Sequence, residues 1–336
     1  MSQASSKRAA GPGRSRSGRG REAGAVWRDG VQLTGTPIWC DARRRRDVCF
    51  ASAYGRVGRA GHGQLIATPA TLAMLGATGP GHLGVPLRRR FSLGQLQLEL
   101  LPSGAGLGAA ALRVEAEGRA TLYAGAVSTR SFGTVEPGEV RAADCVVVAA
   151  PYGLVEHVFP DPATVAPRLI SWVQEQAARG SVLVLVSTEL RALEMAVLLD
   201  AAGLAVCAPP ALRNLARRAR GAVPSVPELR NLARDRPAVV LATTEMRASI
   251  ARRLGAARLA TAWVSGDAVD EAARARAAVD ESFVWSSCAD RAQLLSWIEA
   301  TCAREIYVTG RHAAEIAAHL GPRAAVLGPP LQMPLF

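Results

Sequence analysis

The strongest constraint on the fold is a change in hydrophobic pattern near the middle of the chain. From Val26 to Gly153, short apolar stretches separated by turn residues predict strands, and the alternation in 95–101 (QLQLELL) is typical of half-buried antiparallel strands. After Pro167, apolar strands alternate with amphipathic helices, as in SVLVLVST followed by ELRALEMAVLLDAAG. Such alternation indicates a parallel α/β unit. We therefore expect a mixed α/β protein with two parts of different architecture.

The charge of the chain is strongly positive. The 336 residues are 49% hydrophobic, enough for one large or two medium domains with a sizeable core, and the formal net charge is +12. Lys7 is the only lysine, so nearly all basic residues are arginine, a bias also typical of GC-rich genomes. A polyanionic partner is compatible with this charge, because arginines near phosphates release counterions.

The cysteines and the apolar runs predict the compartment. The six cysteines form no C-x-x-C pair, which is typical of free thiols in a reducing compartment. No apolar run is long enough to span a bilayer, and the N-terminus lacks the apolar segment of a signal peptide. We expect a cytoplasmic protein that does not contact a membrane.

The two ends of the chain differ from the rest. Residues 1–24 are rich in glycine, serine and arginine, and cannot bury enough apolar surface to become ordered. This predicted disordered basic tail is compatible with an electrostatic tether to nucleic acid and equally with a solvated tail that has no role.

The last five residues, QMPLF, resemble the peptide with which bacterial proteins bind the replication sliding clamp. In such a peptide the side chain of Gln332 forms a hydrogen bond at the rim of a pocket, and Met333, Leu335 and Phe336 fill an apolar groove. The preceding GPP is a stiff spacer that holds a peptide away from the domain. The alternative is a hydrophobic C-terminus packed onto the domain.

Several short motifs occur in the order found in one family of nucleases. They are GTPIWCDARRRRDVCFAS, IATPAT, LPSGAGLGAA, LYAGAV, APYG, SSCAD and YVTGR. Over most of 26–336 the chain resembles the metallo-β-lactamase fold nucleases with an inserted β-CASP domain, which include bacterial ligase-associated exonucleases and RNA 3′-end processing endonucleases. The resemblance implies a metallo-β-lactamase αββα sandwich in two parts, 25–170 and 301–328, with a β-CASP-like parallel α/β domain inserted over 171–300. The tail 1–24 and the C-terminal peptide 329–336 lie outside these domains.

The resemblance also implies where a metal site would lie. Family members hold two zinc ions through histidine and aspartate, and the metals activate a bridging water and clamp the scissile phosphate. The corresponding positions here are Ala53, Gly55, Val57, Gly58, Ala105, Ala126, Cys288 and Gly310. Cys288 alone cannot form a stable site, which requires three or four converging ligands. We therefore expect no metal, no cofactor and no two-metal catalysis, and we expect His62 to be a surface or hydrogen-bonded residue.

Three groups of arginines are candidate contacts for a phosphate backbone. They are Arg43, Arg44, Arg45 and Arg46; Arg88, Arg89 and Arg90; and Arg217, Arg218 and Arg220. The alternative for each group is a solvated charged turn or helix face.

Three functional hypotheses follow. The first is a catalytically inactive homologue of these nucleases that acts as a nucleic-acid-binding or scaffold subunit in DNA repair or processing, tethered to the sliding clamp or paired with an active nuclease. The second is an active exonuclease or hydrolase of the same family whose site is rebuilt around Cys288, Asp290, His62 and Tyr54. The third, a decayed gene product, agrees poorly with the regular apolar patterning.

Overall fold

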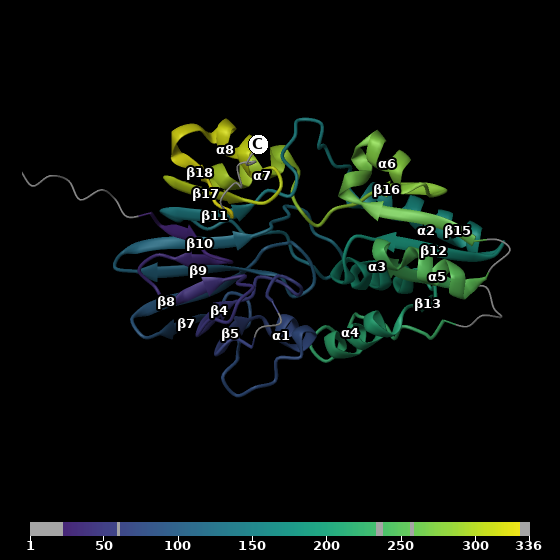
Figure 1. The fold of residues 1–336 in the computed structure, drawn as a ribbon, viewed down its shortest axis with the longest axis horizontal. Helices are drawn as coiled ribbons and strands as arrows, with labels where there is room; N and C mark the ends of the chain where they lie inside the picture. Colours follow the sequence, from purple (N-terminus) through teal and green to yellow (C-terminus); the bar gives the residue numbers. More distant parts are fainter. Residues whose placement is uncertain (1–22, 59–60, 233–237, 256–258, 330–336) are drawn as a thin grey trace, which may run out of the picture.

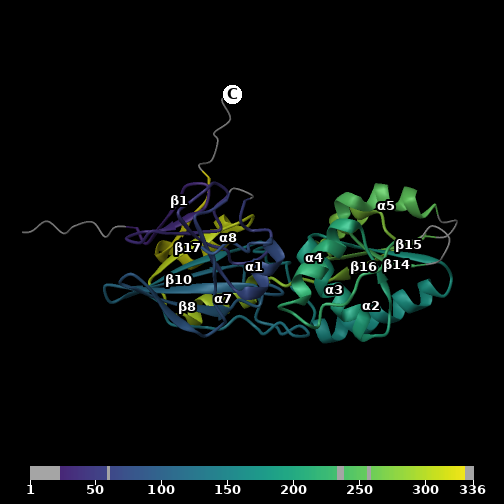
Figure 2. The ribbon, with the colours of Figure 1, turned by 90° about the horizontal axis from the view of Figure 1, so that it is seen from below.

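The protein consists of two lobes that lie side by side (Figure 1). The computed structural model describes residues 23–58, 61–232, 238–255 and 259–329. The first lobe is built on two β-sheets and the second on a single parallel sheet flanked by helices (Figures 1 and 2). The expected mixed α/β class is confirmed.

The first sheet of the first lobe has six strands in chain order. They are β1 (Ala25–Trp27), β2 (Val31–Leu33), β3 (Ile38–Cys40), β4 (Val48–Phe50), β5 (Gln64–Ala67) and β6 (Leu83–Gly84). Pairing is antiparallel from β1 to β3 and parallel from β3 to β6. Helix α1 (Pro69–Leu75) begins at the Thr68 cap and ends at Gly76, which adopts the left-handed conformation that favours glycine.

The second sheet has seven strands in the order β18-β17-β11-β10-β9-β8-β7. Their bounds are β7 (Arg90–Leu93), β8 (Leu96–Pro102), β9 (Ala110–Ala116), β10 (Arg119–Gly125), β11 (Cys145–Ala149), β17 (Glu305–Thr309) and β18 (Ala324–Val326). Strand β11 precedes the second lobe in sequence and β17 follows it, yet the two pair in parallel. The second lobe is therefore an insertion into the first.

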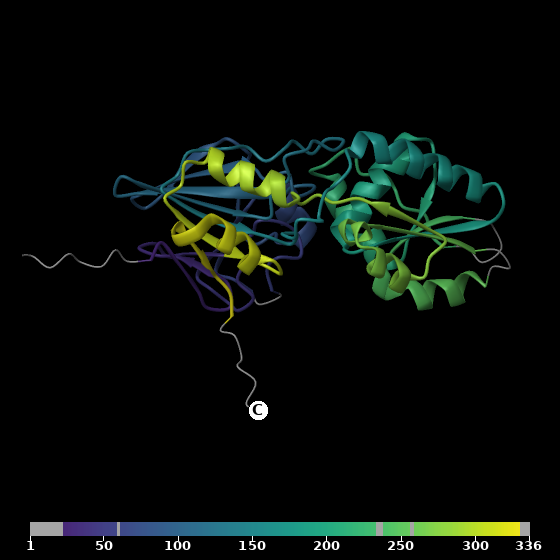
Figure 3. The same ribbon diagram turned by 90° about the horizontal axis from the view of Figure 1, so that it is seen from above.

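The first lobe is layered. Between its two sheets lies one apolar core that includes Phe50 and Ile66 of the first sheet and Leu112 and Val147 of the second. Helices α7 (Arg291–Ala300) and α8 (Ala313–Leu320) cover the outer face of the seven-stranded sheet through a separate apolar core (Figure 3).

Strand β8 departs from the predicted half-buried pattern. Its antiparallel pairing with β9 is confirmed, but the prediction of one exposed face is wrong, because every residue from Leu98 to Pro102 is buried. Leu100 faces the core between the sheets and Leu101 faces the core under the helices. Glu99 tolerates burial because Arg90 and Arg141 lie within ion-pair distance of its carboxylate.

The second lobe is a five-stranded parallel sheet in the order β13-β14-β12-β15-β16. Its strands are β12 (Ser181–Val186), β13 (Val206–Cys207), β14 (Val239–Thr243), β15 (Leu259–Ser265) and β16 (Glu281–Val284). Its helices are α2 (Pro162–Ala177), α3 (Glu189–Ala201), α4 (Pro210–Arg220), α5 (Arg247–Leu254) and α6 (Glu271–Ala277). Val184 of β12 packs in the core with α2, α3 and α4, whereas Leu185 faces the opposite core with α5. The predicted parallel α/β unit is confirmed.

The boundaries of the inserted lobe differ from those expected at 170/171 and 300/301. Helix α2 begins at the Asp161 cap and continues through Pro167, and its Leu169 belongs to the core of the second lobe. Helix α7 belongs to the first lobe, because Trp297 packs in the core under the seven-stranded sheet. The insertion therefore runs from α2 to β16, and each boundary lies closer to the N-terminus than the sequence indicated.

Candidate functional site at the lobe junction

The start of the loop that follows β4 is bonded to a half-buried carboxylate, that of Asp41. Asp41 at the end of β3 accepts hydrogen bonds from the backbone N–H of Ser52 (2.8 Å), from the Ser52 hydroxyl (2.6 Å) and from the Tyr123 hydroxyl (2.9 Å). Burial raises the pKa of Asp41, and the hydrogen bonds from Ser52 and the nearby charge of Arg56 oppose that rise. These three hydrogen bonds connect the end of β3 with β10 and with the start of the loop, and they hold the local structure together.

Three of the positions at which the resemblance would place metal ligands hold buried or half-buried alanines. Ala53 is 6% exposed and belongs to a buried cluster that also contains Leu107 of the first lobe and Leu193 of α3 in the second lobe. Ala105 packs against the same cluster, and Ala126 is buried after β10. Ala53 and Ala105 therefore contribute to the apolar core that joins the two lobes.

Three further positions of this group have a backbone that favours glycine. A Cβ at Gly58 would lie 2.1 Å from the carbonyl oxygen of Arg43, so the loop packs directly on the arginine turn. Gly55 and Gly310 have φ angles of 82° and 97°, which strain any other residue. A histidine at any of these sites would require the backbone to move.

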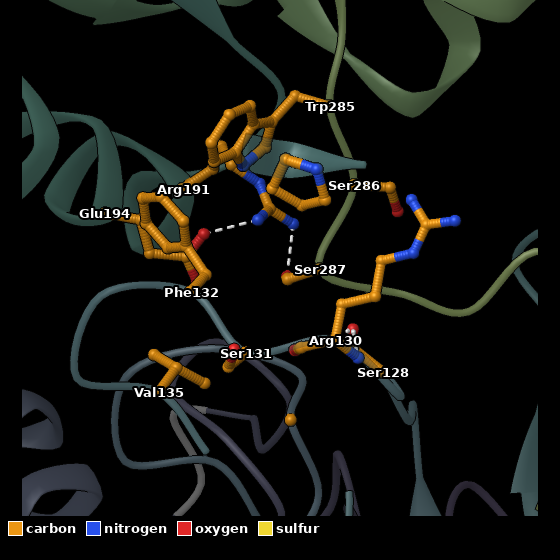
Figure 4. A pocket seen from close by; sticks show the side chains of 12 residues that line it. Ser128, Arg130, Ser131, Phe132, Val135, Arg191, Glu194, Trp285, Ser286 and Ser287 are labelled. Atoms are coloured by element: carbon orange, nitrogen blue, oxygen red, sulfur yellow. Dashed lines mark hydrogen bonds and ion pairs between the residues drawn. The ribbon is translucent and has the colours of Figure 1, made fainter. Parts of the chain in front are cut away.

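A buried ion pair lies where the lobes meet (Figure 4). The Arg191 guanidinium on α3 donates to the carboxylate of Glu194 and to the hydroxyl of Ser287, which follows β16. Ser287 in turn donates to the carbonyl oxygen of Ala105 in the first lobe (3.1 Å). The Glu194 side chain is 1% exposed, and burial raises its pKa while the charge of Arg191 opposes the rise. The chain of contacts from Glu194 to Ala105 fastens the two lobes together.

The space beside this ion pair is nearly filled. The rings of Phe132 and Trp285 meet edge to face, with centroids 4.7 Å apart, across the junction. The cavity that these rings and Arg191 line has a volume of about 10 Å³. One water molecule requires about 10–15 Å³, so this part of the junction has no room for a nucleotide.

Three of the four residues of a rebuilt hydrolase site form structural hydrogen bonds, and the fourth, Cys288, has a raised pKa. Asp290 caps α7 and accepts from the backbone N–H of Gln293 (2.9 Å). Tyr54 donates to Glu189 (2.6 Å), and His62 accepts at Nδ1 from the backbone N–H of Arg46 (3.2 Å). Burial raises the pKa of the Cys288 thiol, which opposes formation of a nucleophilic thiolate. As expected, His62 is hydrogen-bonded; it is buried rather than on the surface.

A pair of histidines near the return to the first lobe is also structural. The rings of His157 and His312 lie 5.0 Å apart, and His157 accepts at Nδ1 from the backbone N–H groups of Gly153 and Leu154 (3.1 and 3.2 Å). Burial and the neighbouring His312 lower the pKa of His157.

Among the residues that the structure describes, no three His, Cys, Asp or Glu side chains are grouped so that they could hold a metal ion.

Many of the candidate phosphate-binding arginines have partners within the protein. Arg44 pairs with Asp29 (3.1 Å), and Arg46 stacks 3.6 Å above the centroid of the Trp39 ring. Arg88 pairs with Glu136 and Glu139, and Arg90 with Glu99. Arg217 bonds to Asn214 on its own helix, and Arg220 pairs with Glu228. Within the described ranges, Arg43, Arg45, Arg89 and Arg218 have no ion pair, so these four are the better candidates.

Two predicted segments lie outside the described part of the chain. The clamp-binding peptide formed by Gln332, Met333, Leu335 and Phe336 lies outside the described residues, as does nearly all of the basic tail. Over the described ranges, none of the helices has both the length and the apolar composition needed to cross a membrane.

Comparison with known proteins gives a fold likeness alone. No family model and no curated protein matches the chain. Among solved structures, it is similar to a crystal structure of a protein of unknown function from Enterococcus faecalis V583, with a TM-score of 0.52 and 11% sequence identity. The match covers 84% of this chain and 79% of that chain, so the likeness extends over both lobes.

Proposed function

We propose that the chain is a catalytically inactive homologue of the metallo-β-lactamase/β-CASP nucleases. It acts in the cytoplasm as a nucleic-acid-binding or scaffold subunit in DNA repair or processing, tethered to the sliding clamp by its C-terminal peptide or paired with an active nuclease. The arrangement of sheets supports this proposal, because two packed sheets with outer helices and an inserted parallel lobe are what the family resemblance implies.

The observation that carries the proposal is the apolar core between the lobes. Ala53 and Ala105, which stand at family ligand positions, pack in or against that core, and Gly58 lies on the backbone of Arg43. An imidazole at Ala53 would place an unpartnered polar group among apolar side chains, which costs about 1–3 kcal/mol. The region has therefore become a packed junction that holds the lobes together.

A nuclease assay tests the proposal. Purified full-length protein is incubated with labelled single-stranded and double-stranded DNA and RNA in the presence of Mn²⁺ or Zn²⁺. We expect no hydrolysis above a blank prepared from cells that lack the protein. Hydrolysis that follows the protein through purification and is lost in the Cys288→Ser variant would contradict the proposal and favour the rebuilt site.

A pull-down with the bacterial sliding clamp tests the tether. Full-length protein is compared with a chain truncated before Gln332 and with a matched variant in which Leu335 and Phe336 are both alanine. We expect the clamp to retain only the full-length protein. Equal retention of all three would contradict the tether.

A further inference from the structure

The first of the two connections between the lobes contains a turn, 153–158, that one histidine holds closed. This connection runs from the end of β11 to the Asp161 cap of α2. His157 is 7% exposed, and its Nδ1 atom accepts from the backbone N–H groups of Gly153 (3.1 Å) and Leu154 (3.2 Å). The backbone N–H of His157 also donates to the carbonyl oxygen of Leu154 (3.1 Å), so the ring and the backbone close the same turn.

Both hydrogen bonds to the ring require that His157 is neutral. A backbone N–H only donates, so a ring nitrogen that accepts from two such groups cannot itself carry a proton. The neutral ring therefore carries its proton on Nε2, and protonation of Nδ1 would place a third N–H among groups that already donate. Because the ring is buried, its charge can be solvated only if the ring leaves the turn.

Two aromatic rings enclose the imidazole and connect it to the second lobe. His312 at the start of α8 and Tyr152 each meet the His157 ring edge to face, with centroids 5.0 and 5.4 Å away. Tyr152 also packs on the ring of Phe159 (4.8 Å). A Cβ at Gly266 of the second lobe would lie 2.3 Å from the Tyr152 hydroxyl oxygen. Displacement of the imidazole therefore removes one support of a ring that contacts the second lobe.

The charged groups around the turn favour the neutral ring. They are Glu156 of the turn, Asp267 of the second lobe, Arg291 of α7, and Arg311, His312 and Glu315 at the start of α8. Burial is the largest cause that lowers the pKa of His157, and the neighbouring His312 is the next. The carboxylates of Glu156 and Asp267 oppose this shift without cancelling it, and Asp267 already pairs with Arg311 (3.3 Å).

We infer that the turn 153–158 is an acid-sensitive latch in the first connection between the lobes. At neutral pH the uncharged ring of His157 holds the turn closed. On acidification Nδ1 takes up a proton from the solvent, the hydrogen bonds from Gly153 and Leu154 are lost, and the ring leaves its place beside Tyr152. The turn opens and the connection loosens, while the cores of both lobes stay folded.

The pH range of the latch follows from the shifted pKa. In the open turn the ring is in water and has the ordinary pKa of about 6.5, whereas in the closed turn burial and His312 lower it. Between these two pKa values the open turn binds more protons than the closed turn, so the closed turn loses stability as the pH falls below about 6.5. Uptake of one proton shifts the opening equilibrium by about tenfold per pH unit in this range.

Hydrogen exchange of single amides, followed by NMR on the full-length protein between pH 7.5 and pH 5, tests the latch. Protection is the measured exchange rate relative to that of an unstructured peptide at the same pH. We expect the protection of Gly153 and Leu154 to fall by about tenfold per pH unit below about pH 6.5, while Leu183 and Val184 in β12 keep theirs. Constant protection of Gly153 and Leu154, or an equal fall in β12, would overturn the inference.

Two variants of His157 separate the acceptor from its titration. His157→Asn places an oxygen that does not titrate near the position of Nδ1, so the two amides should stay protected at every pH. His157→Phe removes the acceptor, so they should exchange rapidly at every pH. A pH dependence in His157→Asn equal to that of the unaltered protein would show that another group is the sensor, and would overturn the inference.

Two further variants test whether His157 is the group that takes up the proton. His312→Phe keeps a ring beside His157 but cannot titrate, and His319→Asn removes an exposed histidine at the other end of α8. Both should retain the fall in protection, and its loss in either variant would assign the sensor elsewhere. Long-range proton–nitrogen spectra at pH 7.5 should show His157 protonated on Nε2, and a proton on Nδ1 would also overturn the inference.

Discussion

Removing Arg191 while keeping Glu194 is the most informative perturbation of the lobe junction. Arg191→Met preserves most of the side-chain volume but leaves the Glu194 carboxylate without its cation. Glu194 is 1% exposed and Arg191 is 11% exposed, so water cannot replace the lost partner. Breaking a buried pair on one side costs about 3–5 kcal/mol, and the lost hydrogen bond to Ser287 adds about 0.5–1.5 kcal/mol. We expect the free energy of unfolding to fall by about 4 kcal/mol at pH 8.

The loss must also depend on pH. Burial raises the pKa of Glu194 above 4.5 in the native protein, and Arg191 opposes that rise, so removing Arg191 raises this pKa further. A carboxyl with a raised native pKa is neutral below that pKa, and its native state loses stability as the pH rises through it. The destabilisation by Arg191→Met should therefore be smaller at pH 5 than at pH 8. In Arg191→Met/Glu194→Leu, where no charge is left buried, most of the loss should disappear.

Urea titrations at the two pH values, followed by tryptophan fluorescence, measure these changes, since Trp285 lies at the junction. The matched control is Arg311→Met, which breaks an exposed ion pair with Asp267 (3.3 Å; side chains 70% and 41% exposed) and should cost less than about 1 kcal/mol. Equal effects of Arg191→Met and Arg311→Met, or an Arg191→Met effect that does not change with pH, would show that Arg191 does not stabilise a buried charge on Glu194.

Three further predictions concern single sites. Gly58→Ala should destabilise the protein by about 1–3 kcal/mol in thermal or urea unfolding, because its Cβ would lie 2.1 Å from a carbonyl oxygen. Gly61→Ala, whose Cβ would meet nothing within 4 Å, should be nearly neutral. Equal effects of the two variants would contradict this packing. Asp41→Asn should lower the free energy of unfolding by about 1–3 kcal/mol, since an amide cannot accept all three hydrogen bonds that reach Asp41. A variant as stable as the unaltered protein would show that these hydrogen bonds are dispensable. Iodoacetamide at neutral pH should alkylate exposed Cys302 well before Cys288, because burial raises the pKa of the Cys288 thiol. Mass spectrometry of a time course measures the order of alkylation. The reverse order would show that Cys288 is an activated nucleophile.

Local patterns predicted the second lobe well. The run SVLVLV is apolar at every position, and β12 is buried throughout because helices cover both faces of its sheet. Helix α7 was not predicted, although its start carries the signal of a capping box, with Asp290 followed three residues later by Gln293.

Features that depend on distant residues were not accessible from the sequence. The burial of Glu99 depends on Arg141, and the junction depends on contacts between residues 96 positions apart, Arg191 and Ser287. The change of pattern at Pro167 predicts a boundary there, but Pro167 lies within α2, whose apolar face packs on the sheet beneath it.

The most direct test of the central claim is the zinc content of the full-length protein. Cells are grown with added zinc, the protein is purified without chelators, and metal per chain is measured by inductively coupled plasma mass spectrometry. We expect much less than one zinc ion per chain, because Ala53 and Ala105 pack in or against the apolar junction and the backbone of Gly55 and Gly310 favours glycine. Two zinc ions per chain, retained through gel filtration, would contradict it.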